Sequence, residues 1–180
     1  MKSQIPLRKF ANSKMTYGGD TTKGKRKCKR PLIPNKLTHL VLKSSKAHGR
    51  LSFFRHSKAI DRFVSQLANK YFIEIKEYVT MSNHLHLKLR FKDPKRFRDF
   101  LKALTSSVAK AVTGARKGRP FGQFWDHVAY THVLISRFEE FGLKIYFQAN
   151  RLEKEFGYEA RETFLKREND KLRRMRMRVI

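Results

Sequence analysis

Apolar and polar residues recur along most of the chain with the periods of regular secondary structure. In residues 84–91 four apolar side chains alternate with four polar ones, the period of two that indicates a half-buried β-strand. Extended, apolar-rich runs at 37–44, 72–80 and 124–135 predict three more strands, and a short extended stretch is expected around residues 51–54. The pattern therefore predicts a sheet of at least four strands.

Between these strands the apolar positions recur at steps of three and four, which predicts helices. The first is expected to be capped by Ser57, and the second to open at Asp93 and end at Gly114. Ser136 and Glu139 form the sequence of a capping box for a third helix. The expected apolar stripe of this third helix comprises Phe138, Phe141, Ile145, Ala149, Leu152 and Phe156.

The resulting order is strand, helix, strand, strand, helix, strand, and then a further helix. This order predicts an α+β fold, the ferredoxin-like split βαβ sandwich, with two helices on one face of an antiparallel sheet. The other face of the sheet would remain available for a site. We expect residues 1–36 to form a basic arm, 37–157 the folded domain, and 158–180 a basic tail that is either helical or disordered.

The net charge of the chain is the compositional feature that says most about its partner. The 180 residues include 42 Lys and Arg against 15 Asp and Glu, a formal charge of +27. A polyanion would relieve the self-repulsion of such a chain, and nucleic acid is the natural candidate because phosphate contacts release counterions. Charge alone separates neither DNA from RNA nor an enzyme from a packing protein.

Composition also bears on the compartment. The single cysteine, Cys28, excludes an internal disulfide, and no apolar run is long enough to cross a membrane. We therefore expect a cytoplasmic protein without a membrane partner.

Two pairs of residues carry candidate chemistry. His84 and His86 are two apart on a predicted strand, so their imidazoles would share one face and could bind a divalent cation. Such a pair is incomplete as a metal site, and taken alone it is more typical of two surface histidines. Tyr146 and Asn150 are four apart on the last predicted helix and would lie one above the other. A tyrosine at the edge of an apolar stripe is also an ordinary feature of an amphipathic helix.

Taken together, these segments resemble a known family. Residues 78–89, YVTMSNHLHLKL, are similar to the motif strand of the single-tyrosine HUH transposases, in which two histidines flank an apolar residue. QFWDHVAYTHVL and YFQAN resemble the Phe-Trp strand and the Tyr-x-x-x-Asn helix of the REP-associated branch. The resemblance covers about residues 37–157. Ser82 stands where the family commonly has proline, and the residues from Arg151 onward depart from the family pattern.

The resemblance implies a single-strand endonuclease and strand-transferase that acts through a 5′-phosphotyrosine. Tyr146 would be the nucleophile, with Tyr130 as the alternative if the register of the helix differs. His84, His86 and Asn150 would hold Mg²⁺ or Mn²⁺, which suit hard oxygen ligands better than Zn²⁺. The implied partner is single-stranded or hairpin DNA, and relatives of this kind commonly act as homodimers.

Five basic residues in two places are expected to contact DNA. Lys88 and Arg90 share the histidine face, whereas Arg116, Lys117 and Arg119 lie in a predicted loop. The competing hypothesis is an inactive or domesticated nucleic-acid-binding protein, because excess positive charge needs no active site. A structural zinc protein is disfavoured, since the cysteine and histidine spacing provides no four-ligand set.

Overall fold

The structure is a computed structural model that describes residues 13–22 and 28–177. The chain forms two compact units. The described part of the first runs from Ser13 to Leu134, and that of the second from Ile135 to Met177. Each unit is described by itself.

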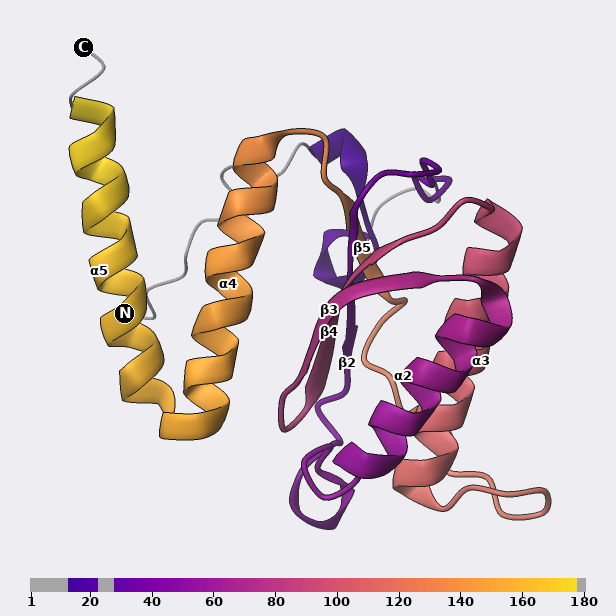
Figure 1. Ribbon diagram of the computed structural model, residues 1–180. Coiled ribbons are helices and arrows are strands. Elements are labelled where there is room, and N and C mark those ends of the chain that lie inside the picture. Colours follow the sequence, from indigo (N-terminus) through magenta and orange to yellow (C-terminus); the bar gives the residue numbers. More distant parts are fainter. Residues whose placement is uncertain (1–12, 23–27, 178–180) are drawn as a thin grey trace. The chain divides into compact units, whose positions relative to one another are not determined.

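The first unit is built on one five-stranded sheet in which every neighbouring pair is antiparallel (Figure 1). The strand order is β1-β5-β2-β4-β3. The strands are β1 (Thr16–Tyr17), β2 (Thr38–Lys43), β3 (Glu74–Thr80), β4 (His84–Arg90) and β5 (Tyr130–Val133). Helix α2 (Ser57–Tyr71) connects β2 to β3, and α3 (Pro94–Thr113) connects β4 to β5. This arrangement confirms the predicted ferredoxin-like split βαβ fold, with β1 added at one edge.

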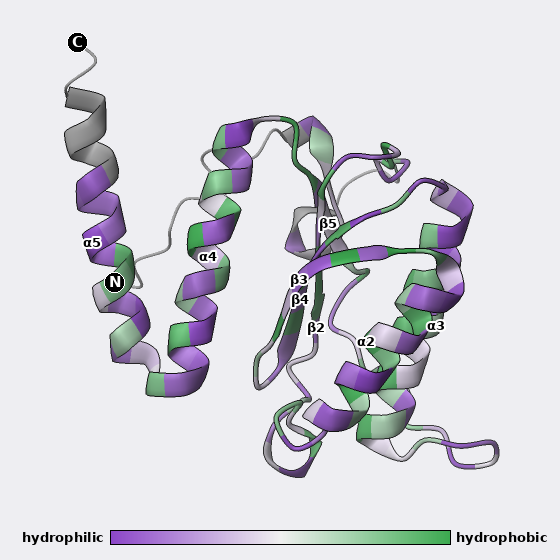
Figure 2. Cartoon of the chain, viewed as in Figure 1, coloured by the Kyte–Doolittle hydropathy of each residue, from purple (hydrophilic) through white to green (hydrophobic). Residues whose placement is uncertain are grey.

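The core lies between one face of the sheet and the two helices, which lie side by side in Figure 1. Leu85, Leu87 and Leu89 of β4 have no exposed surface, as their alternation predicts. They pack with residues of the helices that include Ile60 and Phe100. Figure 2 shows hydrophobic and hydrophilic residues interspersed along both helices, as in amphipathic helices.

The boundaries of the helices follow local chemistry. At the start of α3, the Asp93 carboxylate accepts a hydrogen bond of 2.7 Å from the backbone N–H of Lys95, and Gly114 ends the helix with φ of 69°. The prediction that Ser57 caps α2 is wrong. Ser57 is already helical, and the N-cap residue is His56, which makes no side-chain capping bond.

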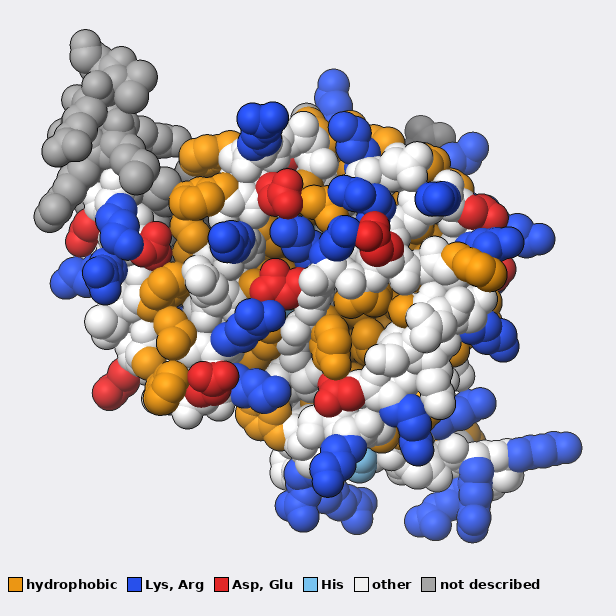
Figure 3. Space-filling model, in the orientation of Figure 1, with side chains coloured by type: hydrophobic (Ala, Val, Ile, Leu, Met, Phe, Trp, Pro, Cys, Tyr) orange, Lys and Arg blue, Asp and Glu red, His pale blue; other side chains and the backbone are white. Residues whose placement is uncertain are grey.

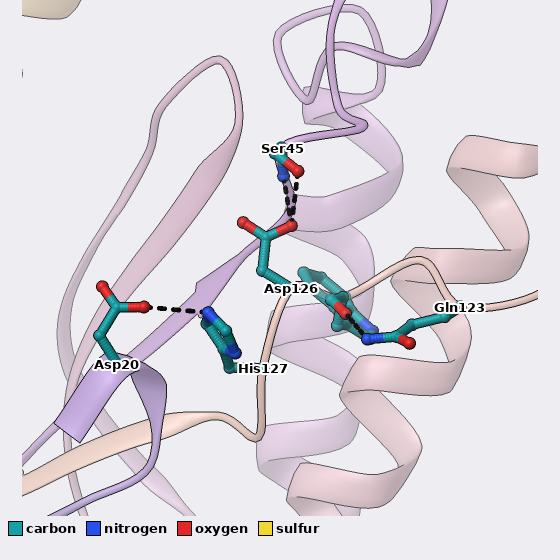
Figure 4. Close-up of polar contacts among 6 residues, drawn as sticks. Asp20, Ser45, Gln123, Asp126 and His127 are labelled. Atoms are coloured by element: carbon teal, nitrogen blue, oxygen red, sulfur yellow. Dashed lines mark hydrogen bonds and ion pairs between the residues drawn. The ribbon is translucent and has the colours of Figure 1, made fainter. Parts of the chain in front are cut away.

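Two strand predictions need correction. Residues 51–54 are not a strand: the 3-10 helix η3 (Gly49–Leu51) is followed by turns. The predicted strand at 124–135 is reduced to Tyr130–Val133. Tertiary hydrogen bonds hold the residues before it in a loop. Trp125 Nε1 donates to the Thr105 carbonyl (3.2 Å), and Asp126 accepts from the backbone N–H and the hydroxyl of Ser45 (2.7 and 2.8 Å; Figure 4).

Part of the expected N-terminal arm belongs to the sheet. Strand β1, with the 3-10 helices η1 (Ser13–Met15) and η2 (Gly19–Thr22) on either side of it, lies within residues 1–36. It pairs with β5, Thr16 lying opposite His132. Asp20 forms an ion pair of 2.9 Å with His127 (Figure 4). These contacts extend the folded unit beyond the predicted start at residue 37. Residues 1–12 and 23–27 of the expected arm lie outside the described residues.

The second unit consists of helices α4 (Arg137–Phe156) and α5 (Tyr158–Met177), joined at Gly157. Ile145 and Ala149 of α4 pack against Leu165 of α5, so the expected basic tail is helical through Met177. The predicted stripe of α4 is wrong at three positions, because Phe138, Phe141 and Phe156 are 42%, 44% and 70% exposed. Within the described residues, no helix has both the length and the apolar character to cross a membrane.

Candidate active site

Strand β4 presents two histidines on the sheet face opposite the helical core. Because Leu85 and Leu87 point into the core, His84 and His86 share the other face. Their ring centroids are 4.6 Å apart and the rings are nearly perpendicular, at 87°. The sequence-based prediction that these imidazoles lie together is therefore consistent with the sheet.

Each of these histidines is held through its Nδ1 atom. His84 Nδ1 lies 2.7 Å from the Asn83 carboxamide oxygen, which can only accept, so His84 donates there. His86 Nδ1 lies 3.1 Å from Nε2 of His39 on the neighbouring strand β2. A neutral imidazole that carries its proton on Nδ1 has its lone pair on Nε2. Nε2 is accordingly the atom through which His84 would bind a cation, and the same holds for His86 if its Nδ1 carries the proton of the contact with His39.

His39 on β2 lies beside this pair and is buried. Its ring stacks on that of His86 with centroids 5.4 Å apart, and only 7% of the residue is exposed. Burial, followed by the charge of His132 on β5, lowers the pKa of His39 to about 3. His39 is therefore neutral at physiological pH.

The donor set limits which metal site is feasible. Among the described residues, no three His, Cys, Asp or Glu side chains are grouped so that they could hold a metal ion. A site on His84 and His86 would thus need a ligand of another type, such as a carboxamide oxygen, water or phosphate. Such oxygen ligands fit Mg²⁺ or Mn²⁺. A four-ligand zinc site has no support in this part of the chain.

In the second unit, α4 carries Tyr146 and Asn150 one turn apart, as predicted. The capping box of Ser136 and Glu139 begins this helix. Burial raises the pKa of the Tyr146 phenol above its ordinary value. A hydrogen bond with the Asn150 side chain and the positive charge of Arg161 act in the opposite direction.

Arg161, whose charge acts on Tyr146, was not predicted from the sequence. It lies on α5, where its Nε atom is 3.2 Å from a carboxylate oxygen of Glu153 on α4. Its side chain is only 18% exposed. The signal in the sequence was weak, because Arg161 stood in a segment interpreted as a basic tail and many other arginines surround it.

The alternative nucleophile, Tyr130, lies in the same unit as the histidines. It pairs with Val41, which in turn pairs with His86, so the three residues form a row across β5, β2 and β4. The Tyr130 ring is edge-on to His39 with centroids 6.1 Å apart. Tyr130 is therefore on the histidine face.

The predicted DNA-binding residues fall into two groups. On β4, Lys88 lies opposite Glu77, and Arg90 forms a long ion pair of 3.8 Å with Glu74, so acidic neighbours offset part of their charge. The second group, Arg116, Lys117 and Arg119, is exposed.

This second group lies on a tight turn that follows α3. Two backbone hydrogen bonds between Arg116 and Arg119, of 3.2 and 2.9 Å, close the turn, and Gly118 has φ of 81°. In Figure 3, Lys and Arg side chains (blue) project from the surface where Figure 1 shows the loop that follows α3. The turn presents three cations to solvent without an acidic neighbour in its own sequence.

Comparison with known proteins supports the fold. No family model and no curated protein matches the chain. A solved structure described as a REP-associated tyrosine transposase bound to a REP hairpin aligns over 74% of this chain and 76% of its own, with a TM-score of 0.54 and 12% identity. A candidate transposase from Deinococcus radiodurans R1 aligns over 69% of this chain and 98% of its own, with 17% identity and a TM-score of 0.43. The chain thus has the fold of the REP-associated enzyme.

Proposed function

We propose that this protein is a metal-dependent transposase-like enzyme that cuts single-stranded DNA with a tyrosine and transfers the cut strand. The observation that carries the proposal is the imidazole pair of His84 and His86, side by side on one face of a ferredoxin-like sheet with both Nδ1 atoms engaged. Two rings held in this way are suited to bind one cation through Nε2. The shared fold with a tyrosine transposase supports the same assignment.

His84, His86 and the carboxamide oxygen of Asn150 are the proposed ligands of Mg²⁺ or Mn²⁺. When bound, the cation would polarise a non-bridging phosphate oxygen and stabilise the charge of the transition state. Tyr146 is hydrogen-bonded to the Asn150 side chain, whose amide nitrogen has no hydrogen-bond partner among the described residues. The phenol contact therefore falls on the carboxamide oxygen, which has two lone pairs and could also contact a cation. Asn150 would then contact both the nucleophile and the cation.

Tyr146 is the proposed nucleophile. Its phenolate oxygen would attack the phosphorus, a new P–O bond to tyrosine would form, and the bond to the 3′ oxygen would break. The 3′ oxygen takes up a proton, which leaves a free 3′-hydroxyl and a 5′-phosphotyrosine. A later attack by a 3′-hydroxyl on this linkage rejoins the strand and returns the phenol. The phosphotyrosine conserves the energy of the bond, so ATP is not required.

The environment of Tyr146 bears directly on this step. A buried phenol resists ionisation, and its pKa is raised here. Arg161 on α5 opposes that effect because its guanidinium favours a negative phenolate, whereas Glu153, its ion-pair partner on α4, raises the pKa of the phenol. We expect Arg161 to support formation of the nucleophile.

The proposed substrate is single-stranded or hairpin DNA, because the structural neighbour is described as bound to a REP hairpin. Arg116, Lys117 and Arg119 on their exposed turn, together with Lys88 and Arg90, would contact the phosphates. A homodimer, as in relatives of this kind, remains a prediction.

A covalent-trapping experiment tests the proposal. The full chain is incubated with 5′- and 3′-labelled hairpin oligonucleotides and Mn²⁺, and denaturing gels are examined for a protein–DNA adduct. Wild type should form the adduct with the strand 3′ of the cut, and Tyr146→Phe should not. Tyr130→Phe separates the two candidate nucleophiles, and Tyr158→Phe, at a 49% exposed residue, is the matched control. Equal trapping by wild type and Tyr146→Phe would show that Tyr146 is not the nucleophile.

A second candidate is a nucleic-acid-binding protein without catalysis. The formal charge of +27 and the protonated state that burial favours for Tyr146 are consistent with it. This candidate predicts DNA binding that falls steeply with salt but is unchanged by EDTA and by His84→Ala. No adduct would form under any condition.

A further inference from the structure

The contact between His39 and His86 joins two strands on the histidine face. Strands β2 and β4 are antiparallel neighbours, and His86 lies opposite Val41. His39 is two residues from Val41 on β2, so it points to the same face and reaches His86 diagonally. Nε2 of His39 and Nδ1 of His86 are 3.1 Å apart, within hydrogen-bonding distance.

Chemistry decides the direction of this hydrogen bond if His86 binds a cation. A neutral imidazole has one protonated nitrogen and one lone pair in its plane. To offer Nε2 to a cation, His86 must carry its proton on Nδ1, and that proton then points at His39. His39 must in turn accept through Nε2 and carry its own proton on Nδ1. The pair can therefore support a metal site in only one arrangement of two protons.

We propose that His39 is a positioning residue that fixes the tautomer and the ring orientation of His86, so that His86 presents the lone pair of Nε2 on the histidine face. This inference rests on the proposed function of His84 and His86. Asn83 has the matching role for His84, because its carboxamide oxygen lies 2.7 Å from Nδ1 of that ring. Each of the two histidine ligands thus has its own acceptor, one from the preceding residue and one from a neighbouring strand.

A purely structural role for His39 makes different predictions. If the ring only fills space beside His132 and Tyr130, a phenylalanine of similar shape should replace it without effect on His86. If the acceptor nitrogen matters, phenylalanine should fail and glutamine, whose carbonyl oxygen can accept, should largely succeed. The two substitutions separate shape from hydrogen bonding.

The first measurement is the tautomer itself. In the metal-free wild-type protein, long-range ¹⁵N–¹H correlation spectra should show His86 protonated on Nδ1. In His39→Phe this preference should be lost, and a mixture of both tautomers should appear. Finding wild-type His86 protonated on Nε2 would overturn the inference, and this result does not depend on the folding of any variant.

The second measurement is Mn²⁺ binding to the full chain, monitored by the loss of the free Mn²⁺ signal in electron paramagnetic resonance. His39→Phe should bind about 10–100-fold more weakly than wild type, the usual effect of removing a group that orients a ligand. His39→Gln should stay within about threefold of wild type, and so should the control His132→Phe, which changes the residue opposite His39 on β5. Equal affinities for wild type and His39→Phe, or equal weakening by Phe and Gln, would overturn the inference.

His84→Ala separates this failure from failure of the proposed function. If His84→Ala abolishes Mn²⁺ binding while His39→Phe leaves it unchanged, only the role of His39 is wrong. If wild type and His84→Ala bind Mn²⁺ equally, the proposed metal site is wrong and the inference falls with it.

Discussion

The capping box at the start of α4 should stabilise the helix that carries Tyr146. The Ser136 hydroxyl accepts a 3.2 Å hydrogen bond from the Glu139 backbone N–H. In return, one carboxylate oxygen of Glu139 accepts from the backbone N–H groups of Ile135 (2.7 Å) and Ser136 (3.2 Å). Three N–H groups that the helix cannot satisfy internally are thereby paired.

The magnitudes follow from these bonds. Ser136→Ala removes one neutral cap and should lower the free energy of unfolding of the helical unit by about 1 kcal/mol. Glu139→Ala removes two hydrogen bonds to a charged group and its favourable position at the helix N-terminus, so we expect about 1.5–3 kcal/mol. Because the two residues act together, the double substitution should cost less than the sum of the single ones.

Urea unfolding followed by circular dichroism measures the overall change, and amide hydrogen exchange locates it. In Ser136→Ala the Glu139 amide should exchange about fivefold faster, the factor that corresponds to roughly 1 kcal/mol. Ser57→Ala is the matched control, because Ser57 lies in the first turn of α2 but does not occupy its N-cap position. Equal destabilisation by Ser136→Ala and Ser57→Ala, or faster exchange elsewhere than in the first turn of α4, would show that the capping box does not stabilise this helix.

Three further predictions concern the core, the nucleophile and the basic turn. Leu87→Ala, at a side chain with no exposed surface, should lower the free energy of unfolding by about 2–5 kcal/mol in urea titrations, and a cost below about 1 kcal/mol would contradict its place in the core. The ultraviolet difference titration of wild type against Tyr146→Phe should give a midpoint above the ordinary value of about 10, because burial raises the pKa of Tyr146. Since the unfolded chain then ionises first, Tyr146 should make folding less favourable as pH rises past about 10, and a midpoint below that value would refute the assignment. Replacing Arg116, Lys117 and Arg119 together by serine should reduce the slope of log K against log salt by about 2 for single-stranded DNA, whereas an unchanged slope would show that the turn does not contact phosphate.

The sequence-based predictions held where a local rule was sufficient. The alternation around Leu85 and Leu87 placed β4 and its buried face correctly, and Asp93, Gly114 and the capping box marked helix ends that the structure confirms. These features depend only on the direction in which successive side chains point and on backbone groups at helix ends. They are therefore visible in a short window of residues.

Predictions failed where distant residues compete for the backbone. Residues 124–129 have the composition of a strand, but two hydrogen bonds hold part of them in a loop. Ser45 donates to Asp126, and Trp125 donates to the Thr105 carbonyl. The stripe of α4 included exposed phenylalanines, because periodicity identifies apolar rows but not the row that a neighbouring helix such as α5 covers. The folded part of the N-terminal region was missed because two-residue strands carry no periodic signal.

The same division applies to the candidate site. The periods of a strand and a helix were enough to predict that His84 and His86 share a face and that Tyr146 and Asn150 lie one turn apart. The contact of His39 with His86, and the ion pair of Arg161 on α5 with Glu153 on α4, became visible in the folded chain alone. Those partners are separated by 47 and 8 residues and meet through strand register and helix packing, which are cooperative properties of the folded chain that no local pattern records.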